Sequence, residues 1–104
     1  SHVDRSDAGT TEFTEEFMAF ITRYAWGDVW TRPGLEKKTR SLLNLAMLAA
    51  LNRESEFKLH VKGALNNGAT SEDIKEVLFQ VSIYAGVPAA LSAFQWAQDV
   101  MDGL

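Results

Sequence analysis

Residues 42–51 read LLNLAMLAAL, a run in which Asn44 is the one polar side chain. A helix over this run is apolar nearly all round, and such a helix belongs in the centre of a domain or in an interface between subunits. The sequence predicts that this helix begins near residue 35 and ends near residue 51. Strand-like alternation of polar and apolar residues is not visible along the chain, so we expect helices elsewhere too.

Four further helices are expected. The first covers about 14–25, with Thr14 as its N-cap and an apolar stripe spaced three and four apart. The next runs from about 54 to 66 and ends at Asn67-Gly68, a C-cap signal. Another opens at Thr70 with an acidic first turn, and the last begins near Pro88 and ends around 102–103. We therefore predict an all-α fold, a compact bundle of about five helices over 14–104, after an N-terminal arm over 1–13.

The composition excludes several classes of function. The 104 residues carry a net charge of −4, whereas a nucleic-acid-binding domain normally shows a basic excess. No apolar run reaches the length of about 18 residues expected of a membrane span, and residues 1–10 lack the apolar core of a signal peptide. The absence of cysteine removes disulfides and thiolate catalysis, and one interior histidine makes a zinc site uncommon. We expect a cytoplasmic protein with no metal site, no membrane and no nucleic-acid partner.

The interior histidine, His60, is the first candidate for acid–base chemistry, because imidazole changes charge near neutral pH. Glu56 precedes it by one helical turn, and Gly63 and Asn67 follow on the same face of the helix. A glycine inside a helix costs roughly 1 kcal/mol relative to alanine. Gly63 therefore indicates either open space beside the imidazole or close packing by another helix. Taken alone, His60 is more typical of a structural or surface role than of catalysis.

Basic and aromatic side chains form two further groups of candidates. The basic group suggests an anion site, since arginine pairs bidentately with carboxylates, although a solvated helix start is the plainer interpretation. The aromatic group suggests pocket walls near a loop and a helix break, although such side chains more often belong to a core. The basic group contains Arg32, Lys37, Lys38 and Arg40, and the aromatic group contains Trp26, Trp30 and Tyr84.

Six segments together carry a family resemblance. WTRPG (30–34) and YAGVPAA (84–90) are the most specific, and the others are FITRYAWG (20–27), KTRSLL (38–43), LH (59–60) and NNGAT (66–70). Over about residues 10–103 the chain resembles the carboxymuconolactone decarboxylase family, a branch of the alkylhydroperoxidase D-like superfamily. The resemblance implies an all-helical fold that assembles from dimers into larger rings, commonly hexamers. It places the apolar run 42–51 and the alanines of the last helix in subunit interfaces.

The same superfamily contains thiol peroxidases, whose two cysteines precede a histidine in the pattern CxxCxxxH. Aligned on His60, Arg53 and Glu56 stand at the two cysteine positions, so thiol peroxidase activity is excluded. An acidic residue that is common upstream in the peroxidases falls at Ser41, a second departure from that branch.

The resemblance implies a small anionic substrate, an unsaturated five-membered lactone that carries a ring carboxylate and an acetate arm. Loss of CO₂ leaves electrons that delocalise into the lactone carbonyl, so no cofactor is implied. Under this hypothesis His60 protonates the dienolate or hydrogen-bonds its oxygen, and Glu56 orients His60 or raises its pKa. Arg40 is the first candidate for the substrate carboxylate, followed by Arg32 and Lys38.

The remaining pocket walls are assigned to Trp30 and Tyr84. Two alternatives stay open at this point. One is a related decarboxylase or lactone-processing enzyme with another substrate, because fold does not fix function. The other is a helical oligomer without catalytic activity.

Overall fold

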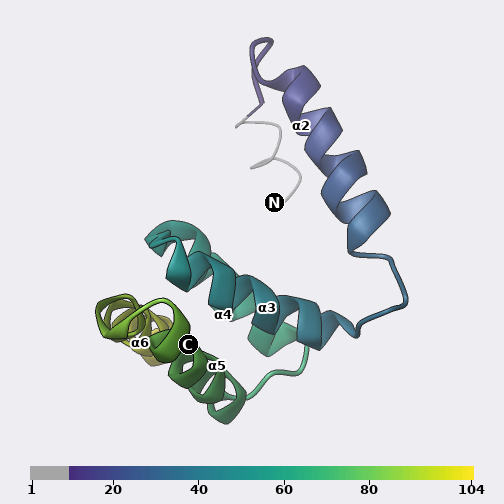
Figure 1. The fold of residues 1–104 in the computed structure, drawn as a ribbon. Helices are drawn as coiled ribbons and strands as arrows, with labels where there is room; N and C mark the ends of the chain where they lie inside the picture. Colours follow the sequence, from purple (N-terminus) through teal and green to yellow (C-terminus); the bar gives the residue numbers. More distant parts are fainter. Residues whose placement is uncertain (1–9) are drawn as a thin grey trace. The chain divides into compact units, whose positions relative to one another are not determined.

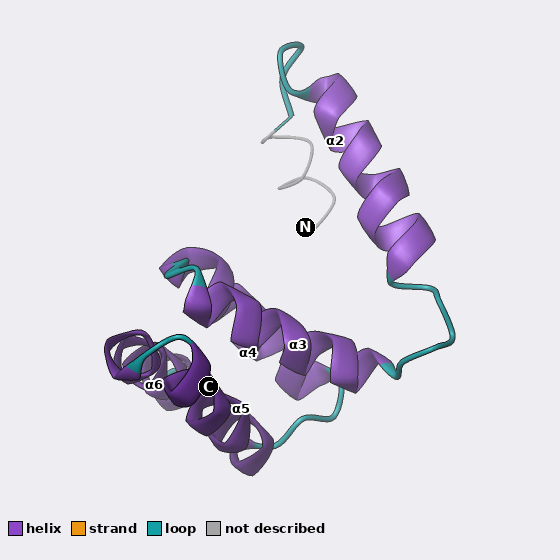
Figure 2. Ribbon diagram, viewed as in Figure 1, coloured by secondary structure: helices purple, strands orange, loops and turns teal. Residues whose placement is uncertain are grey.

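The computed structural model describes residues 10–104, and every regular element in that range is a helix (Figures 1 and 2). The predicted all-α class is therefore confirmed. Most of the predicted N-terminal arm, 1–13, lies outside the described residues. In chain order the elements are α2 (Glu15–Ile21), η1 (Thr22–Val29), α3 (Lys37–Ala50), α4 (Glu54–Asn66), α5 (Ser71–Tyr84) and α6 (Val87–Asp102).

The chain divides into two units, Ser1–Gly34 and Leu35–Leu104. Each unit is described by itself. A single domain over 14–104 stays a prediction.

The described part of the first unit is one continuous helical segment, α2 followed by the π-helical η1. It extends four residues beyond the predicted end near residue 25, because Gly27 and Asp28 keep a helical backbone. Thr14 precedes α2 as predicted, but its hydroxyl accepts a hydrogen bond from the Thr11 N–H at 2.8 Å instead of capping the first turn. No described residue of this unit is buried, and the Phe20 and Tyr24 rings stack at 5.2 Å on its surface.

In the second unit, α3 and α4 form one antiparallel pair, and α5 and α6 form the other (Figure 1). α3 begins two residues later than predicted, whereas α4 has the predicted bounds. Asn52, at φ 60°, closes the tight turn between α3 and α4. Gly68, at φ 96°, reverses the chain after α4 in a conformation that favours glycine.

The start of α5 carries the predicted cap in full. The Thr70 hydroxyl accepts a hydrogen bond from the Asp73 N–H at 3.1 Å, and the Asp73 carboxylate accepts one from the Thr70 N–H at 3.0 Å. This reciprocal pair is a capping box. Gly86, at φ 103°, separates α5 from α6, and Pro88 lies in the first turn of α6 as predicted.

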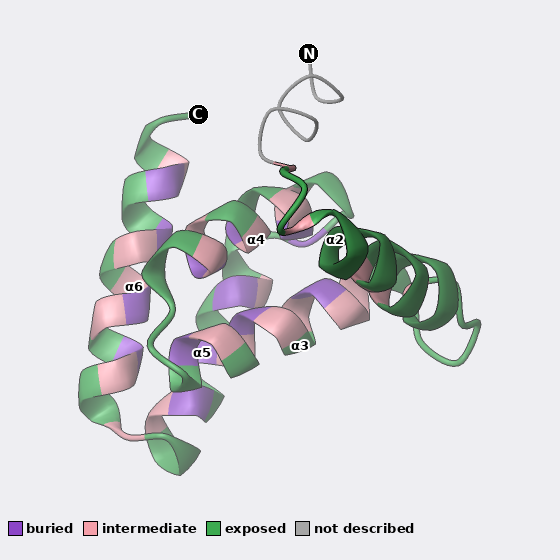
Figure 3. Cartoon of the chain, turned by 90° about the horizontal axis from the view of Figure 1, so that it is seen from above, coloured by how far each residue is buried: buried purple, intermediate pink, exposed green. Residues whose placement is uncertain are grey.

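The core fills the space between the four helices of the second unit, and Figure 3 shows buried positions on each of them. Phe57 is fully buried, and its ring lies 5.8 Å from that of Trp96 on α6. Complete burial of one such side chain contributes about 1.5–3 kcal/mol. The buried apolar residues of this core are Leu45, Ala49, Phe57, Val61, Ala64, Ala69, Ile74, Leu78, Val81, Ala90, Ala93, Ala97 and Val100.

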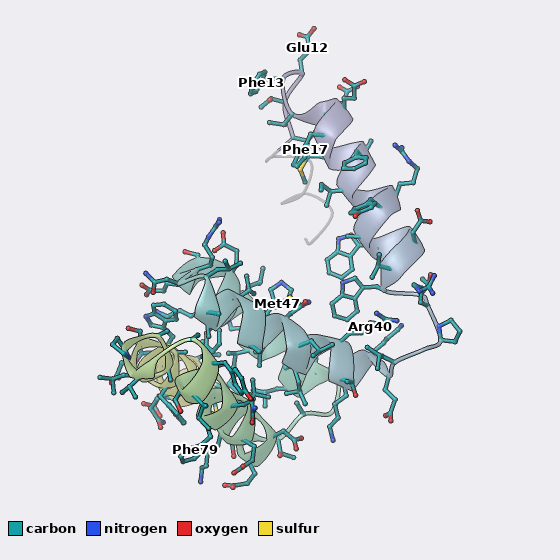
Figure 4. The ribbon with its side chains drawn as sticks, in the orientation of Figure 1. Glu12, Phe13, Phe17, Arg40, Met47 and Phe79 are labelled. Carbon is teal, nitrogen blue, oxygen red and sulfur yellow. The ribbon has the colours of Figure 1, made fainter. Side chains whose placement is uncertain are left out.

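The apolar run of α3 is not enclosed on all sides within one chain. Leu45 and Ala49 are fully buried, but Leu43 is 47% exposed and Met47 is 54% exposed. Met47 projects from α3 in Figure 4. Of the two predicted places for such a helix, the centre of a domain accounts for one side of α3 only. Within residues 35–104, the other side is left exposed.

Candidate functional site

His60 lies on the flank of α4, beside the buried row of Phe57, Val61 and Ala64. About 100° of rotation per residue places His60 some 60° from Phe57, at the border between core and surface. The side chain is accordingly half-buried. The sequence-predicted row of Glu56, His60, Gly63 and Asn67 shares this flank, which we call the histidine face.

Two opposing influences act on the imidazole. Partial burial lowers the pKa of His60, because the charged form loses hydration, and the nearby Glu56 carboxylate raises it by a smaller amount. The net direction is down, so the environment of His60 favours the neutral imidazole. The predicted influence of Glu56 has the expected sign but is outweighed by burial.

Glu56 has a partner of its own. Arg53 Nη2 donates a hydrogen bond to Glu56 Oε1 at 3.0 Å, one turn before the histidine. A hydrogen bond from its own backbone N–H, followed by the bond from Arg53, lowers the pKa of Glu56. Arg53 and Glu56, the two positions occupied by cysteines in the thiol peroxidases, thus form an ion pair at the surface of α4.

Gly63 lies one turn after His60, and a Cβ built at this glycine meets no atom within 4 Å. Of the two interpretations that the sequence left open, close packing by another helix is not found among the four helices of the second unit. Open space is what the structure shows on this part of the histidine face.

One hydrogen bond shows which helix the histidine face adjoins. Asn67 Nδ2 donates to Ser41 Oγ at 3.0 Å, and Ser41 is a buried polar residue of α3, only 2% exposed. Because α3 and α4 run antiparallel, residue 41 lies opposite residue 67, and His60 lies about 10 Å further along the pair. Ser41, the position of an acidic residue in the peroxidases, here fixes the register of the two helices.

Arg40 precedes Ser41 at the N-terminal end of α3 (Figure 4), and its Nε atom is buried. About 100° of rotation separates Arg40 from Ser41, on the side of Ser41 opposite to Lys38. Arg40 and His60 thus belong to the same antiparallel pair, offset by about two helical turns along it.

Two other predicted site residues lie where α3 and α5 meet. Lys38 Nζ forms an ion pair with Asp73 Oδ2 of α5 at 3.4 Å. Tyr84, at the end of α5, is 83% exposed and lines an apolar groove of about 450 Å³ between α3 and α5. The second unit does not bring Lys38 or Tyr84 to the histidine face.

This groove was not identified from the sequence, although the apolar run 42–51 was its signal. Its lining contains two polar side chains, Thr39 and Gln80, among apolar neighbours. The α3 and α5 residues that line it are Thr39, Leu42, Leu43, Ala46, Met47, Ala50, Val77, Gln80, Val81, Tyr84 and the adjacent Ala85.

Trp30 and Arg32 belong to the first unit. The Trp30 ring stacks on that of Trp26 at 5.3 Å, and the Arg32 N–H donates to the Val29 carbonyl at 3.1 Å. These contacts give the connection after η1 an ordered, aromatic start. A role for Trp30 and Arg32 beside His60 stays a prediction.

Two properties of residues 10–104 bear on other kinds of site. Within that range, no helix combines the length and the apolar character needed to cross a membrane. Across the same residues, no group of three or more histidine or acidic side chains is placed to hold a metal ion.

The arrangement suits proton transfer to a small molecule. A half-buried imidazole with a lowered pKa stands next to open space, on a helix joined to α3 by a part-buried hydrogen bond. Such a group can donate a hydrogen bond to an oxygen atom, or transfer a proton when a neighbouring negative charge has raised its pKa.

Two known decarboxylases are similar to this chain over nearly its whole length. A 4-carboxymuconolactone decarboxylase from Acinetobacter baylyi is 45% identical over 103 residues, which is 99% of this chain and 77% of the relative. A nitrosuccinic acid decarboxylase from Metarhizium robertsii is 36% identical over 103 residues, 99% of this chain and 72% of the relative. Residues 15–99 match the carboxymuconolactone decarboxylase family as a whole. Because this match covers most of the chain and includes parts of both units, the chain belongs to the carboxymuconolactone decarboxylase family.

Proposed function

We propose that this chain is a carboxy-lyase that converts 4-carboxymuconolactone to 3-oxoadipate enol-lactone in the breakdown of aromatic compounds. The observation that carries the proposal is the 45% identity with the Acinetobacter decarboxylase across 99% of the chain. The half-buried His60 beside the open space at Gly63 supplies a place for the chemistry.

The reaction needs no cofactor, because the substrate is its own electron sink. The bond between the ring carbon and its carboxylate breaks, and CO₂ leaves. The electron pair of that bond passes through the ring double bond to the carbonyl oxygen of the lactone. The resulting dienolate takes one proton at the carbon next to the carbonyl. The protein must therefore bind the carboxylates, stabilise the developing oxyanion and deliver a proton.

We assign the proton to His60 and the carboxylate to Arg40. A neutral imidazole is a poor acid, but a bound substrate with two carboxylates favours the charged form and raises the pKa of His60. Proton uptake therefore accompanies substrate binding. Glu56 acts as a weaker electrostatic partner, since it pairs with Arg53. Arg32, Lys38, Trp30 and Tyr84 remain substrate-binding candidates by resemblance.

The test is turnover of 4-carboxymuconolactone, followed by NMR through loss of the substrate and appearance of the enol-lactone. His60→Ala removes the general acid and is expected to slow turnover about 10²–10⁴-fold. Arg40→Ala should raise KM and lower kcat, and Arg40→Lys should restore the charge but not bidentate binding. Lys62→Ala, an exposed change on the same helix as His60, is the matched control.

Circular dichroism must show the same helix content in every variant. Near-native rates in both His60→Ala and Arg40→Ala would refute the site assignment. No turnover by the wild-type chain would refute the substrate.

A second substrate class has support from one comparison. The chain is 36% identical to the nitrosuccinic acid decarboxylase over 99% of its length. Nitrosuccinic acid also has two carboxyl groups, and its nitro group accepts the electron pair that decarboxylation releases. Turnover of nitrosuccinate without turnover of the lactone favours this alternative. Binding and turnover of neither compound favours the helical oligomer without catalytic activity.

We also propose that the chain forms a homo-oligomer, with dimers assembled into a hexamer. The support is the uncovered apolar surface along α3 and α5, where Met47 is 54% and Ile83 is 74% exposed. Analytical ultracentrifugation of the wild-type chain decides this, because a monomer over the micromolar range contradicts it. The cytoplasmic location expected from composition stays a prediction.

A further inference from the structure

Gly63 is a glycine for which the second unit, residues 35–104, supplies no structural reason. It lies inside α4, and its backbone is helical, whereas Gly68 and Gly86 have positive φ values that favour glycine. A Cβ at Gly63 meets nothing within 4 Å, so no neighbouring atom approaches too closely for a side chain. Glycine inside a helix lowers its stability relative to alanine. The absence of a side chain at this position therefore lowers the stability of the helix, and no contact within the second unit compensates for it.

The direction of the missing side chain connects it to His60. On a helix the Cα–Cβ bond tilts toward the N-terminus, so a side chain covers the turn that precedes its own residue. A side chain at position 63 would cover the turn that contains Leu59 and His60. Residues three apart also have neighbouring Cβ atoms, about 5–6 Å from each other. Gly63 is thus the position on the histidine face whose side chain would most directly narrow access to the imidazole.

We infer that Gly63 determines which substrates reach His60, by leaving space for a flat, carboxylate-bearing ring against the helix. This inference rests on the proposed function. The side chains on both sides of this space have partners, because Glu56 pairs with Arg53 and Asn67 donates a hydrogen bond to Ser41. The space at Gly63 lies between these fixed side chains.

The test is a graded series at this position. Alanine and leucine both have higher helix propensity than glycine, so Gly63→Ala and Gly63→Leu leave the melting temperature unchanged or raise it. Turnover of 4-carboxymuconolactone should fall with side-chain size. We expect an increase in KM of about tenfold for alanine, the effect of one overpacked methyl group, and a larger one for leucine. Lys62→Leu, one residue away and about 100° around α4, is the matched control and should keep wild-type kinetics.

A second measurement does not depend on turnover. Diethyl pyrocarbonate modifies accessible imidazoles, and peptide mass spectrometry gives the rate at His60 relative to His2, the other histidine. Modification of His60 should slow from the wild type to Gly63→Ala and again to Gly63→Leu. If the wild type does not turn over the lactone but modification slows along the series, the proposed substrate fails and the open space stands.

Two results would overturn the inference. Unchanged KM and unchanged modification rates in both variants would show that position 63 does not limit access. A loss of oligomer on sedimentation, already with Gly63→Ala, would show that the glycine accommodates a neighbouring subunit instead of a substrate.

Discussion

The hydrogen bond from Asn67 to Ser41 allows the most direct test of how the site is held. Ser41 is 2% exposed, and the Asn67 amide donates to its hydroxyl at 3.0 Å across the pair of α3 and α4. Asn67→Ala leaves the buried hydroxyl without this donor. A buried polar group that loses its partner costs about 1–3 kcal/mol, and Asn67 is itself exposed, so we expect a loss of about 1–2 kcal/mol.

The assay is urea unfolding followed by circular dichroism, at one protein concentration, since association changes apparent stability. For a domain of this size a loss of 1 kcal/mol lowers the melting temperature by about 4–8 °C. Ser41→Ala and the double variant complete a mutant cycle, with an expected coupling of about 1 kcal/mol. Asn66→Ala, at the neighbouring exposed position, is the control.

The reasoning fails if Asn67→Ala destabilises the protein no more than Asn66→Ala, or if the coupling is within about 0.3 kcal/mol of zero. In the first case the end of α4 is held by its backbone alone. In the second, the two side chains act independently, and Ser41 does not set the register that places His60.

Three other predictions follow from single features. Because burial lowers the folded-state pKa of His60, the unfolded chain binds the proton more readily, and stability falls as pH drops through the unfolded value of 6.5 to the folded one. Urea unfolding at stepped pH values should show this slope, and His60→Gln should remove it. Thr70→Ala breaks the capping box and should cost about 1 kcal/mol by the same assay, with Thr70→Ser close to wild type. Gly86→Ala forces a side chain to φ 103° and should lower the melting temperature by scanning calorimetry, whereas Gly34→Ala, in open space, should not.

Local signals in the sequence predicted the helices well where the backbone chemistry is strong. The Asn67-Gly68 ending and the Thr70 cap predicted the end of α4 and the start of α5 to within a residue. The first helix was predicted to end near residue 25, which is too early, because the helical backbone continues through Gly27. A single glycine lowers helix propensity without ending a helix, and here the segment continues in π form to Val29.

The candidate site was predicted less completely than the fold. The row of His60, Gly63 and Asn67 follows from spacing alone, but the contact of Asn67 with Ser41 depends on how two helices pair, which no local pattern contains. The sequence also did not predict the direction in which the pKa of His60 shifts. A neighbouring carboxylate is visible in the sequence, whereas the burial that outweighs it is a property of the packed structure.

The basic residues at the start of α3 are close together in the sequence, but the helix places them on different sides of its axis. Lys38 and Arg40 are two residues apart, and a helix places such residues about 160° from each other around its axis. Lys38 accordingly turns to α5, where it pairs with Asp73, while Ser41 faces α4 through Asn67. Arg40 lies beyond Ser41, on the side away from Lys38. Within the second unit, Lys38 is therefore engaged in holding α3 to α5, whereas the binding of a carboxylate by Arg40 stays a prediction.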